Sequence, residues 1–334
     1  MPAVTAFGME DYYLWDCSVI RAEGAYHLFC SRWKKTLGFG WNWLFHSEVI
    51  RAEAERPEGP YVFRELVFPR RGRAYFDGMS THNPAVLRFR DRFYLYYMGT
   101  VYGGEAPAGE PEEAFVCETW NRKRIGLAAA DSASGEFRRG EEPLLEPRSC
   151  AHWDCTCTTN PTATVLPDGK TYLIYKSRRA YGAPLALGVC TAERPEGPFR
   201  RLSDEPIFDF ADPNLHVEDP FLWYDAARKV FCLIAKDDVK NGARGITGEW
   251  GGGFYAESRD CVHFEIAEDP AVYLRNGLQR ADGRTGGFCN LERPSLLFDE
   301  SGRPTHLFLA SGEGKSPYAF EKETEILCVP LKNN

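Results

Sequence analysis

The chain has 334 residues, of which 43% are hydrophobic and 14% aromatic, and its formal net charge is −8. This composition is ample for a folded core, contains no apolar run of about 20 residues that would cross a membrane, and lacks the basic face that a nucleic-acid partner demands. Eleven cysteines without a regular framework indicate reduced thiols rather than a disulfide scaffold. Residues 1–8 lack the basic and apolar regions of a secretory signal, so we expect a cytoplasmic protein.

Five short motifs of similar character recur along the chain at intervals of roughly 60 to 80 residues. Each motif places a polar or charged residue just before an apolar run. The motifs are Asp16-Cys17-Ser18-Val19-Ile20, Asn83-Pro84-Ala85-Val86-Leu87, Asn160-Pro161-Thr162-Ala163-Thr164, Glu218-Asp219-Pro220-Phe221-Leu222 and Arg293-Pro294-Ser295-Leu296-Leu297. Because proline is tolerated at the first residue of a strand, we expect each motif to open a strand with the polar residue at its mouth.

A turn signal and an aromatic-rich run follow each motif, which predicts a hairpin in every unit. A third apolar run and a short edge piece complete the unit. In the first unit we assign the third strand to residues 43–46 (Trp-Leu-Phe-His) and the fourth to residues 61–63. The near-duplicate linkers 54–61 and 192–199, which share Ala-Glu-Arg-Pro-Glu-Gly-Pro, are expected to join the third strand to the fourth in two different units.

Four antiparallel strands per unit, repeated radially, predict an all-β fold, a five-bladed β-propeller around a central funnel. We expect residues 1–334 to form a single domain, because a closed ring of repeats behaves as one cooperative unit. The last unit ends directly after its third strand. Residues 2–7 are therefore expected to supply its outermost strand and close the ring.

The strand mouths converge on one funnel, so acidic residues far apart in the sequence should become neighbours. The candidate acids are Asp16, Asp77, Asp154, Glu218, Asp219 and Glu292. Crowded carboxylates raise one another's pKa, which lets a general acid stay protonated near neutral pH. An inverting glycosidase needs such an acid and a base about 6.5 to 9.5 Å apart. Since adjacent strand residues point to opposite faces, we expect only one of Glu218 and Asp219 to face the pocket, while the other binds backbone or a cation.

Other residues near the mouths are candidates for contacts with a sugar. Trp33 and Trp41 are suited to stacking on a sugar ring, with core packing between blades as the alternative. His82 would hold a substrate hydroxyl, with a purely structural hydrogen bond as the alternative. Asp77, Asp219 and Glu292 are further candidate substrate contacts, although Glu292 with Arg293 is most simply a buried ion pair that locks the ring.

Basic residues follow the second strands and are predicted to form one rim over the funnel. They are Arg32, Lys34, Lys35, Lys176, Arg178, Arg179, Lys236 and Lys315. Such a rim on an acidic protein indicates an anionic sugar, and Arg178 and Lys236 are its main candidate contacts. Ion pairing of these residues with neighbouring acids is the alternative interpretation.

Two further segments bear on cofactors and access. The insertion 102–124, rich in Gly, Pro and Glu, is expected to form a lid or a contact with a neighbour. The cysteines of residues 150–157 match no common zinc spacing, so no metal site is assigned to them. No cofactor is required, although a structural calcium ion in the central channel beside His82 or Asp219 stays open.

The Asp-x-Ser-Val opening at Asp16, the Asn-Pro openings, the Val217-Glu218-Asp219-Pro220 segment and the repeated Pro-Glu-Gly-Pro linkers resemble the five-bladed propeller glycosidases of glycoside hydrolase family 43 and its relatives in families 32, 68 and 117. The resemblance implies that Asp16 is the general base and Glu218 the general acid. The family's third acid, which tunes the general acid, would fall on Asn160. By this resemblance Asp154 or Asp77 takes its place, or the catalytic pair differs.

We therefore expect an inverting, exo-acting glycoside hydrolase that acts on short, anionic oligosaccharides. Two alternatives stay open. One is a glycoside phosphorylase of similar fold, in which basic rim residues hold inorganic phosphate. The other is a sugar-binding propeller without catalysis, which Asn83 and Asn160 favour because acids would otherwise stand there. The expected partner is an oligosaccharide, and the sequence sets no oligomeric state.

Overall fold

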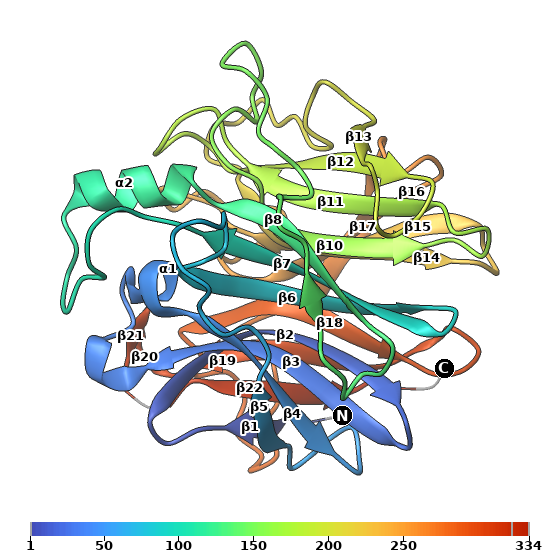
Figure 1. Ribbon diagram of the computed structural model, residues 1–334. Helices are drawn as coiled ribbons and strands as arrows, with labels where there is room; N and C mark the ends of the chain where they lie inside the picture. The colour runs from blue at the N-terminus through green and yellow to red at the C-terminus, as the bar shows by residue number, and fades with distance from the viewer. Residues whose placement is uncertain (1, 322, 333–334) are drawn as a thin grey trace.

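The computed structural model describes residues 2–321 and 323–332, and its strands form five four-stranded antiparallel sheets (Figure 1). From the inner strand outward, the first three blades are β2 (Tyr12–Ala22), β3 (Ala25–Lys34), β4 (Glu48–Ala54) and β5 (Val62–Leu66); β6 (Ser80–Phe89), β7 (Arg92–Thr100), β8 (Arg124–Ala130) and β9 (Arg138–Arg139); and β10 (Thr159–Val165), β11 (Thr171–Ser177), β12 (Ala186–Ala192) and β13 (Arg200–Arg201). The last two blades are β14 (Val217–Asp225), β15 (Val230–Asp237), β16 (Gly253–Ser258) and β17 (Glu265–Tyr273); and β18 (Asn290–Phe298), β19 (Pro304–Gly312), β22 (Glu325–Pro330) and β1 (Val4–Gly8). The predicted all-β, five-bladed β-propeller is confirmed.

The N-terminal strand closes the ring as predicted. β1 pairs antiparallel with β22, so the outermost strand of the fifth blade comes from the opposite end of the chain. Phe7 and Ala6 are buried in a cluster that also contains Trp15 of the first blade and Phe308 of the fifth. The strand thus joins the two ends of the chain through hydrogen bonds and through apolar packing.

The core of the propeller lies between neighbouring blades rather than inside any one of them. Among the described residues, five apolar clusters each combine side chains of two adjacent blades. Between the third and fourth blades, for example, Val189 packs with Leu233 and Phe254. A blade alone would expose both faces of its sheet to water, so the blades depend on one another for burial of their apolar surface.

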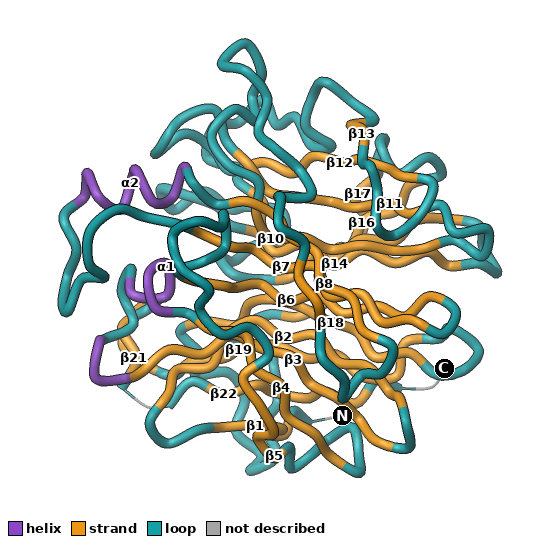
Figure 2. Tube along the Cα trace, in the orientation of Figure 1, coloured by secondary structure: helices purple, strands orange, loops and turns teal. Residues whose placement is uncertain are grey.

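The non-strand elements gather at one end of the propeller, which lies on the left in Figures 1 and 2. These elements are the short 3₁₀ segment Lys35–Leu37, α1 (Asn42–His46), α2 (Glu113–Asn121) and the small hairpin of β20 (Gly314–Ser316) and β21 (Ala319–Phe320). The inner strands begin at this end: Ser80 at the start of β6 donates to the carbonyl of Ser47 just after α1, and Tyr318 between β20 and β21 donates its N–H to Asn290 at the start of β18. No helix in the part of the chain that the structure describes is long and apolar enough to span a bilayer.

One strand assignment from the sequence was wrong. Residues 43–46 lie in α1, and the third strand of the first blade is β4, which begins at Glu48. The apolar run of α1 is buried against α2 instead of in the sheet, through Leu44 and Phe45. A short apolar run cannot be assigned to strand or helix by its pattern alone, and here tertiary packing decides. The linkers 54–61 and 192–199 do join third to fourth strands, as predicted.

Closure by β1 makes a testable prediction about stability. Replacing Phe7 with Ala is expected to lower the free energy of unfolding by about 3–5 kcal/mol, because a buried aromatic side chain leaves a cavity between the first and fifth blades. Thr5→Ala, on the exposed face of the same strand, is the matched control and should cost no more than about 1 kcal/mol. Chemical denaturation monitored by fluorescence measures both. Equal, small effects would show that β1 is not part of the cooperative fold.

Candidate active site

One residue of each inner strand has a left-handed backbone conformation, with φ between 49° and 59°. These five residues, here called the axial ring, are Asp16, Asn83, Asn160, Asp219 and Arg293. The strand register shifts at each of them, so each lies in a β-bulge. Bulges re-aim side chains, and left-handed φ in non-glycine residues is concentrated at functional sites. The repeated sequence motif therefore corresponds to a repeated backbone irregularity at the centre of the propeller.

Arg293 is the cation of the axial ring. Its Nε lies 2.9 Å from Oδ1 of Asp16, and its Nη1 forms an ion pair with Oδ1 of Asp219. These carboxylates belong to the first and fourth blades, whereas Arg293 belongs to the fifth. Burial alone would lower the pKa of Arg293, but Asp219 and Asp16 outweigh it and raise the pKa above its usual value. The predicted ring-locking ion pair thus exists, but Arg293 makes it with Asp16 and Asp219.

Asp16 is 2% exposed, and both of its carboxylate oxygens are bound. The Ser31 hydroxyl donates to Oδ2 over 2.7 Å, and Asn83 donates its backbone N–H to Oδ2 over 3.1 Å and its side-chain amide to Oδ1 over 2.8 Å. Burial disfavours the charged form, but His82, Arg293 and these donors outweigh it, so the pKa of Asp16 is lowered. Asp16 is ionised at neutral pH and held in one orientation.

His82 is a partner of Asp16. Its Nε2 lies 3.0 Å from Oδ2 of Asp16, and its Nδ1 lies 2.7 Å from the Ser47 hydroxyl. Burial lowers the pKa of His82 to about 4, with Arg293 adding to the effect. The imidazole is therefore neutral, with its hydrogen on Nε2 toward the carboxylate and Nδ1 accepting from Ser47. Both ring nitrogens are in use, as the structural alternative for this residue expected.

Glu218 lies between two lysines. Lys176 from β11 is 2.6 Å from Oε2, and Lys236 from β15 is 2.9 Å from Oε1. Burial would raise the pKa of Glu218, but the two ammonium groups outweigh it and lower the pKa well below its usual range. The sequence predicted a carboxylate kept protonated by neighbouring acids. At Glu218 the neighbouring cations reverse that effect.

The raised carboxyl pKa belongs to Asp219 instead. Burial raises the pKa of Asp219, and the charge of Glu218 adds to this against the opposing effect of Arg293. Asn160 donates to Oδ1 of Asp219 over 2.9 Å, while Oδ2 is buried without a hydrogen-bond partner. Asn160, where the resemblance placed a third acid, is thus a neutral hydrogen-bond donor to this carboxyl group.

Glu218 and Asp219 both bind cations, which differs from the expected alternation of faces. The reason is the bulge between Glu218 and Phe221, where Asp219 has φ of 55°. Regular alternation requires extended backbone, and the bulge interrupts it. The two carboxyl groups therefore lie at two levels of the same axis: Asp219 is in the axial ring, and Glu218 lies one residue nearer the start of β14.

Glu292 of the fifth blade binds Lys236, so this lysine bridges Glu292 and Glu218. Tyr318 donates its hydroxyl hydrogen to Glu292 over 2.7 Å, and its side chain is also near Lys236. Although 42% of Tyr318 is exposed, its hydroxyl reaches this buried pair. Sequence reasoning missed Tyr318 because the residue lies in a short hairpin outside the five-fold repeat.

Two predicted site residues lie elsewhere. Asp77 accepts from Tyr97 and is ion-paired with Arg71 and Arg139. Asp154 makes the same set of contacts one blade later, with Tyr175, Arg148 and Arg201. Arg139 and Arg201 belong to the outermost strands β9 and β13, so these carboxylates tie the outer parts of their blades together. The structure does not bring either one to the axial ring, where the resemblance needed a third acid.

The aromatic candidates surround the site at the end where the inner strands begin. Trp33 is buried, with its ring centroid 6.0 Å from that of His82. Trp43 stacks on His82 at 4.9 Å, and Trp41 contacts Trp120 of α2 at 5.8 Å. Trp250, from the glycine-rich loop before β16, has its ring centroid 4.5 Å from the Lys236 ammonium. Trp33 follows the core-packing alternative, whereas Trp43 and Trp41 connect the axial residues to α2.

The basic residues do not form one exposed rim. Lys176, Arg178 and Lys236 are buried around Glu218 and Trp120. Lys35 pairs with Glu323, and Lys315 pairs with Glu321. Arg32 stacks on Tyr12 and Phe63. The ion-pairing alternative therefore describes several of these residues.

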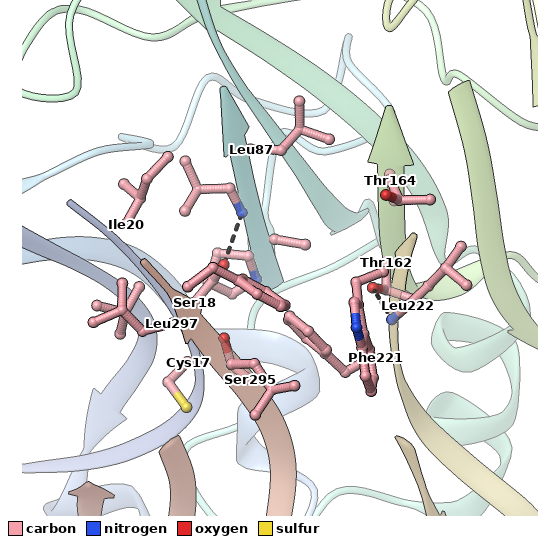
Figure 3. Close-up of a pocket in the computed structure, with 18 of the residues that line it drawn as sticks. Cys17, Ser18, Ile20, Leu87, Thr162, Thr164, Phe221, Leu222, Ser295 and Leu297 are labelled. Carbon is pink, nitrogen blue, oxygen red and sulfur yellow. Dashed lines mark hydrogen bonds between the residues drawn. The ribbon is translucent and has the colours of Figure 1, made fainter. Parts of the chain in front are cut away.

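A cavity of about 870 Å³ lies on the other side of the axial ring (Figure 3). Its walls are the later parts of all five inner strands, starting from the ring residues themselves. Hydrogen bonds cross between blades along it: Ser18 accepts from the N–H of Val86, and Thr162 accepts from the N–H of Leu222, each over 2.9 Å. The axial ring thus separates this channel from the Glu218 side of the site.

The described residues do not fit a calcium ion at the axis. His82 has both ring nitrogens in use, and Asp219 binds Arg293 and Asn160. Arg293 already places a positive charge between the carboxylates that would coordinate a cation. Within residues 2–321 and 323–332 no group of three or more His, Cys, Asp or Glu side chains is arranged to hold a metal.

The central ion pairs predict a large stability effect. Arg293→Met is expected to lower the free energy of unfolding by about 3–5 kcal/mol, because Asp16 and Asp219 would be left as buried carboxylates without their cation. Arg303→Met, which removes an exposed arginine paired with Asp299 in the same blade, should leave stability close to wild type. Urea denaturation of the two variants measures the difference. An Arg293→Met protein as stable as wild type would contradict the role given to this residue.

No protein-family model matches the chain. A curated beta-xylosidase from Xylanibacter ruminicola is 26% identical over 195 residues, which cover 54% of this chain and 53% of that protein, so the chain matches about half the length of this relative. Solved structures match over nearly the whole chain. A family 117 glycoside hydrolase from the marine bacterium Zobellia galactanivorans has a TM-score of 0.68 and 18% identity, covering 98% of this chain and 88% of its own.

Two further solved structures have similar scores. A complex of BT0996 with RGII has a TM-score of 0.70 at 12% identity and covers 98% of this chain and 90% of its own. A GH43_1 enzyme from Xanthomonas citri has a TM-score of 0.61 at 14% identity, with 99% and 91% covered. The chain therefore has the five-bladed β-propeller fold of glycoside hydrolases of families 43 and 117.

Proposed function

We propose that the chain is a glycoside hydrolase in which Asp16 is the general base and Glu218 the general acid, and that it acts with inversion on the ends of short, anionic oligosaccharides. The observation that carries the proposal is the position of these two buried carboxylates: they come from the first and fourth blades and both interact with Arg293. The fold shared with solved glycoside hydrolases and the local similarity to a beta-xylosidase support the same reaction class.

Asp16 suits the role of base because its partners keep it charged and fix its orientation. An ionised carboxylate can accept a proton from water as the water attacks the anomeric carbon. Neutral His82 and Asn83 hold the carboxylate through its oxygens without neutralising it. The same partners limit the directions from which a water can approach.

Glu218 must carry a proton to act as the acid, and Lys176 and Lys236 oppose this. The enzyme is therefore expected to work best on the acidic side of neutrality. The cover over the site, formed by α2 and by Tyr318, favours entry of a chain end over binding of an internal segment. Exposed aromatic surface on Tyr318 is suited to stacking on a sugar ring.

Replacing the acid tests the assignment directly. Glu218→Gln is expected to lower hydrolysis by about 10²–10⁴-fold, because the amide cannot donate a proton to the leaving group. Glu265→Gln, an exposed acid on β17 of the same blade, is the control and should retain wild-type turnover. Purified proteins are screened against neutral and acidic oligosaccharides by NMR, which also reports the anomeric form of the released sugar. Retained activity in Glu218→Gln would eliminate Glu218 as the acid.

The same screen, run with and without phosphate, separates the alternatives. Free sugar released with inverted configuration would support hydrolysis by inversion. Sugar phosphate formed only when phosphate is present would identify a phosphorylase. Affinity for oligosaccharides with no turnover across the panel would identify a sugar-binding propeller.

The lysines make a second prediction, about pH. A general acid must be protonated, so activity falls as pH rises through its pKa, and Lys176 holds that pKa low. Lys176→Met should raise the pKa of Glu218 and move the basic limb of the kcat/KM profile upward by about one pH unit or more. Lys240→Met, a partly exposed lysine that pairs with Asp238, should leave the limb in place. An unmoved limb in Lys176→Met would mean that another group sets it.

A further inference from the structure

The insertion 102–124 brings a buried lysine to the site that sequence reasoning did not single out. Lys123, two residues after the end of α2, is 1% exposed. Its ammonium nitrogen lies 3.1 Å from the centroid of the Trp120 ring and 5.6 Å from that of Trp43. No acidic side chain among the described residues forms an ion pair with it. Burial, together with Lys176 and Arg178, lowers the pKa of Lys123 well below its usual value.

Arg178 approaches the same indole. Its guanidinium carbon lies 4.4 Å from the Trp120 ring centroid and 4.5 Å from that of Tyr181. The side chain is 8% exposed, and its Nε and Nη2 atoms are buried without a hydrogen-bond partner. Arginine Nε and a terminal nitrogen can together bind two oxygens of one carboxylate or phosphate. This pair of free donors is therefore a site for an oxyanion.

The charge around Trp120 is unbalanced. Lys176 lies 5.9 Å from the Trp120 centroid, so three cations approach one indole, whereas Glu218 is the carboxylate that binds any of them among the described residues. Buried cations without an anion are unfavourable, and attraction to an aromatic face offsets only part of the cost. This concentration of positive charge contrasts with the net charge of −8 of the whole chain. A bound anion would balance it.

We propose that Lys123 and Arg178 form an oxyanion-binding subsite beside Trp120, next to Glu218, that takes a carboxylate, sulfate or phosphate group. The inference rests on the proposed function for its place in the reaction. The oxyanion can be carried by the sugar substrate, or it can be free inorganic phosphate. An anion bound there also competes with Glu218 for Lys176, which connects occupancy of the subsite to the state of the proposed acid.

Direct binding tests the subsite without any turnover. Phosphate, sulfate and glucuronate are titrated into the protein by calorimetry, with chloride at equal ionic strength as the reference. We expect wild type to bind at least one of them, and Lys123→Met and Arg178→Met each to bind about tenfold or more weakly. The adjacent exposed residues supply matched controls, Arg122→Met and Arg179→Met, which should bind like wild type. Failure of wild type to bind all three anions, or equal binding by every variant, would overturn the proposal.

A second measurement guards against misfolding of the variants. Without an anion, Lys123 is a buried cation lacking an acidic partner among the described residues, so Lys123→Met should melt at or above the wild-type temperature in chloride. Phosphate or the bound anion should raise the melting temperature of wild type but not of Lys123→Met. If Lys123→Met instead melts below wild type in chloride, Lys123 is a structural clamp on Trp120 and the subsite is rejected.

Turnover then distinguishes the two sources of the oxyanion. If the sugar carries it, the ratio of kcat/KM for acidic over neutral oligosaccharides should fall about tenfold or more in Arg178→Met and stay unchanged in Arg179→Met. If it is inorganic phosphate, wild type should form sugar phosphate, and the KM for phosphate should rise in Arg178→Met. Anion binding that is lost in the variants, with no turnover in wild type, would support the subsite while counting against the proposed hydrolase function.

Discussion

The arrangement of the site depends on one buried guanidinium that lies among carboxylates from different blades. Arg293 of the fifth blade pairs with Asp16 of the first and Asp219 of the fourth. Carboxylates buried this close to one another could not all remain ionised without a cation between them. The ion pairs also connect the fifth blade to both of its neighbours in the ring, including the first blade at the far end of the sequence. Stability of the closed propeller and the charge state of Asp16 therefore rest on the same side chain.

The repeat supplies the framework, and the insertions make the site specific. All five inner strands have the same bulge and the same left-handed residue, so the framework offers five equivalent positions around the axis. The residues that break this equivalence come from segments between strands: Lys123 and Trp120 from the α2 insertion, and Tyr318 from the small hairpin of the last blade. These segments cover the end of the propeller where the inner strands begin. A common fold can acquire a new binding preference in this way without change to its core.

The electrostatics show why a count of nearby acids does not determine the charge state of any one of them. Glu218 and Asp219 are consecutive and both buried, yet their pKa values shift in opposite directions. Two lysines flank Glu218, whereas one oxygen of Asp219 has no hydrogen-bond partner. Each lysine reaches Glu218 from a second strand, Lys176 from the neighbouring third blade and Lys236 from the same blade. The difference follows from the contacts of each carboxyl group rather than from its position in the sequence.

The sequence by itself determined the five-fold repeat, the four strands of each blade and the closure by residues 2–7, because strand periodicity and turn residues are local properties that recur. It also placed Asp16, Glu218 and Asp219 at the centre, since equivalent motif positions in a propeller converge on its axis. Only the tertiary structure decided that residues 43–46 form a helix, that Asp77 and Asp154 bind arginines of outer strands, and that Lys123 lies buried at the site. Those outcomes depend on partners distant in sequence, and local pattern carries no information about such partners.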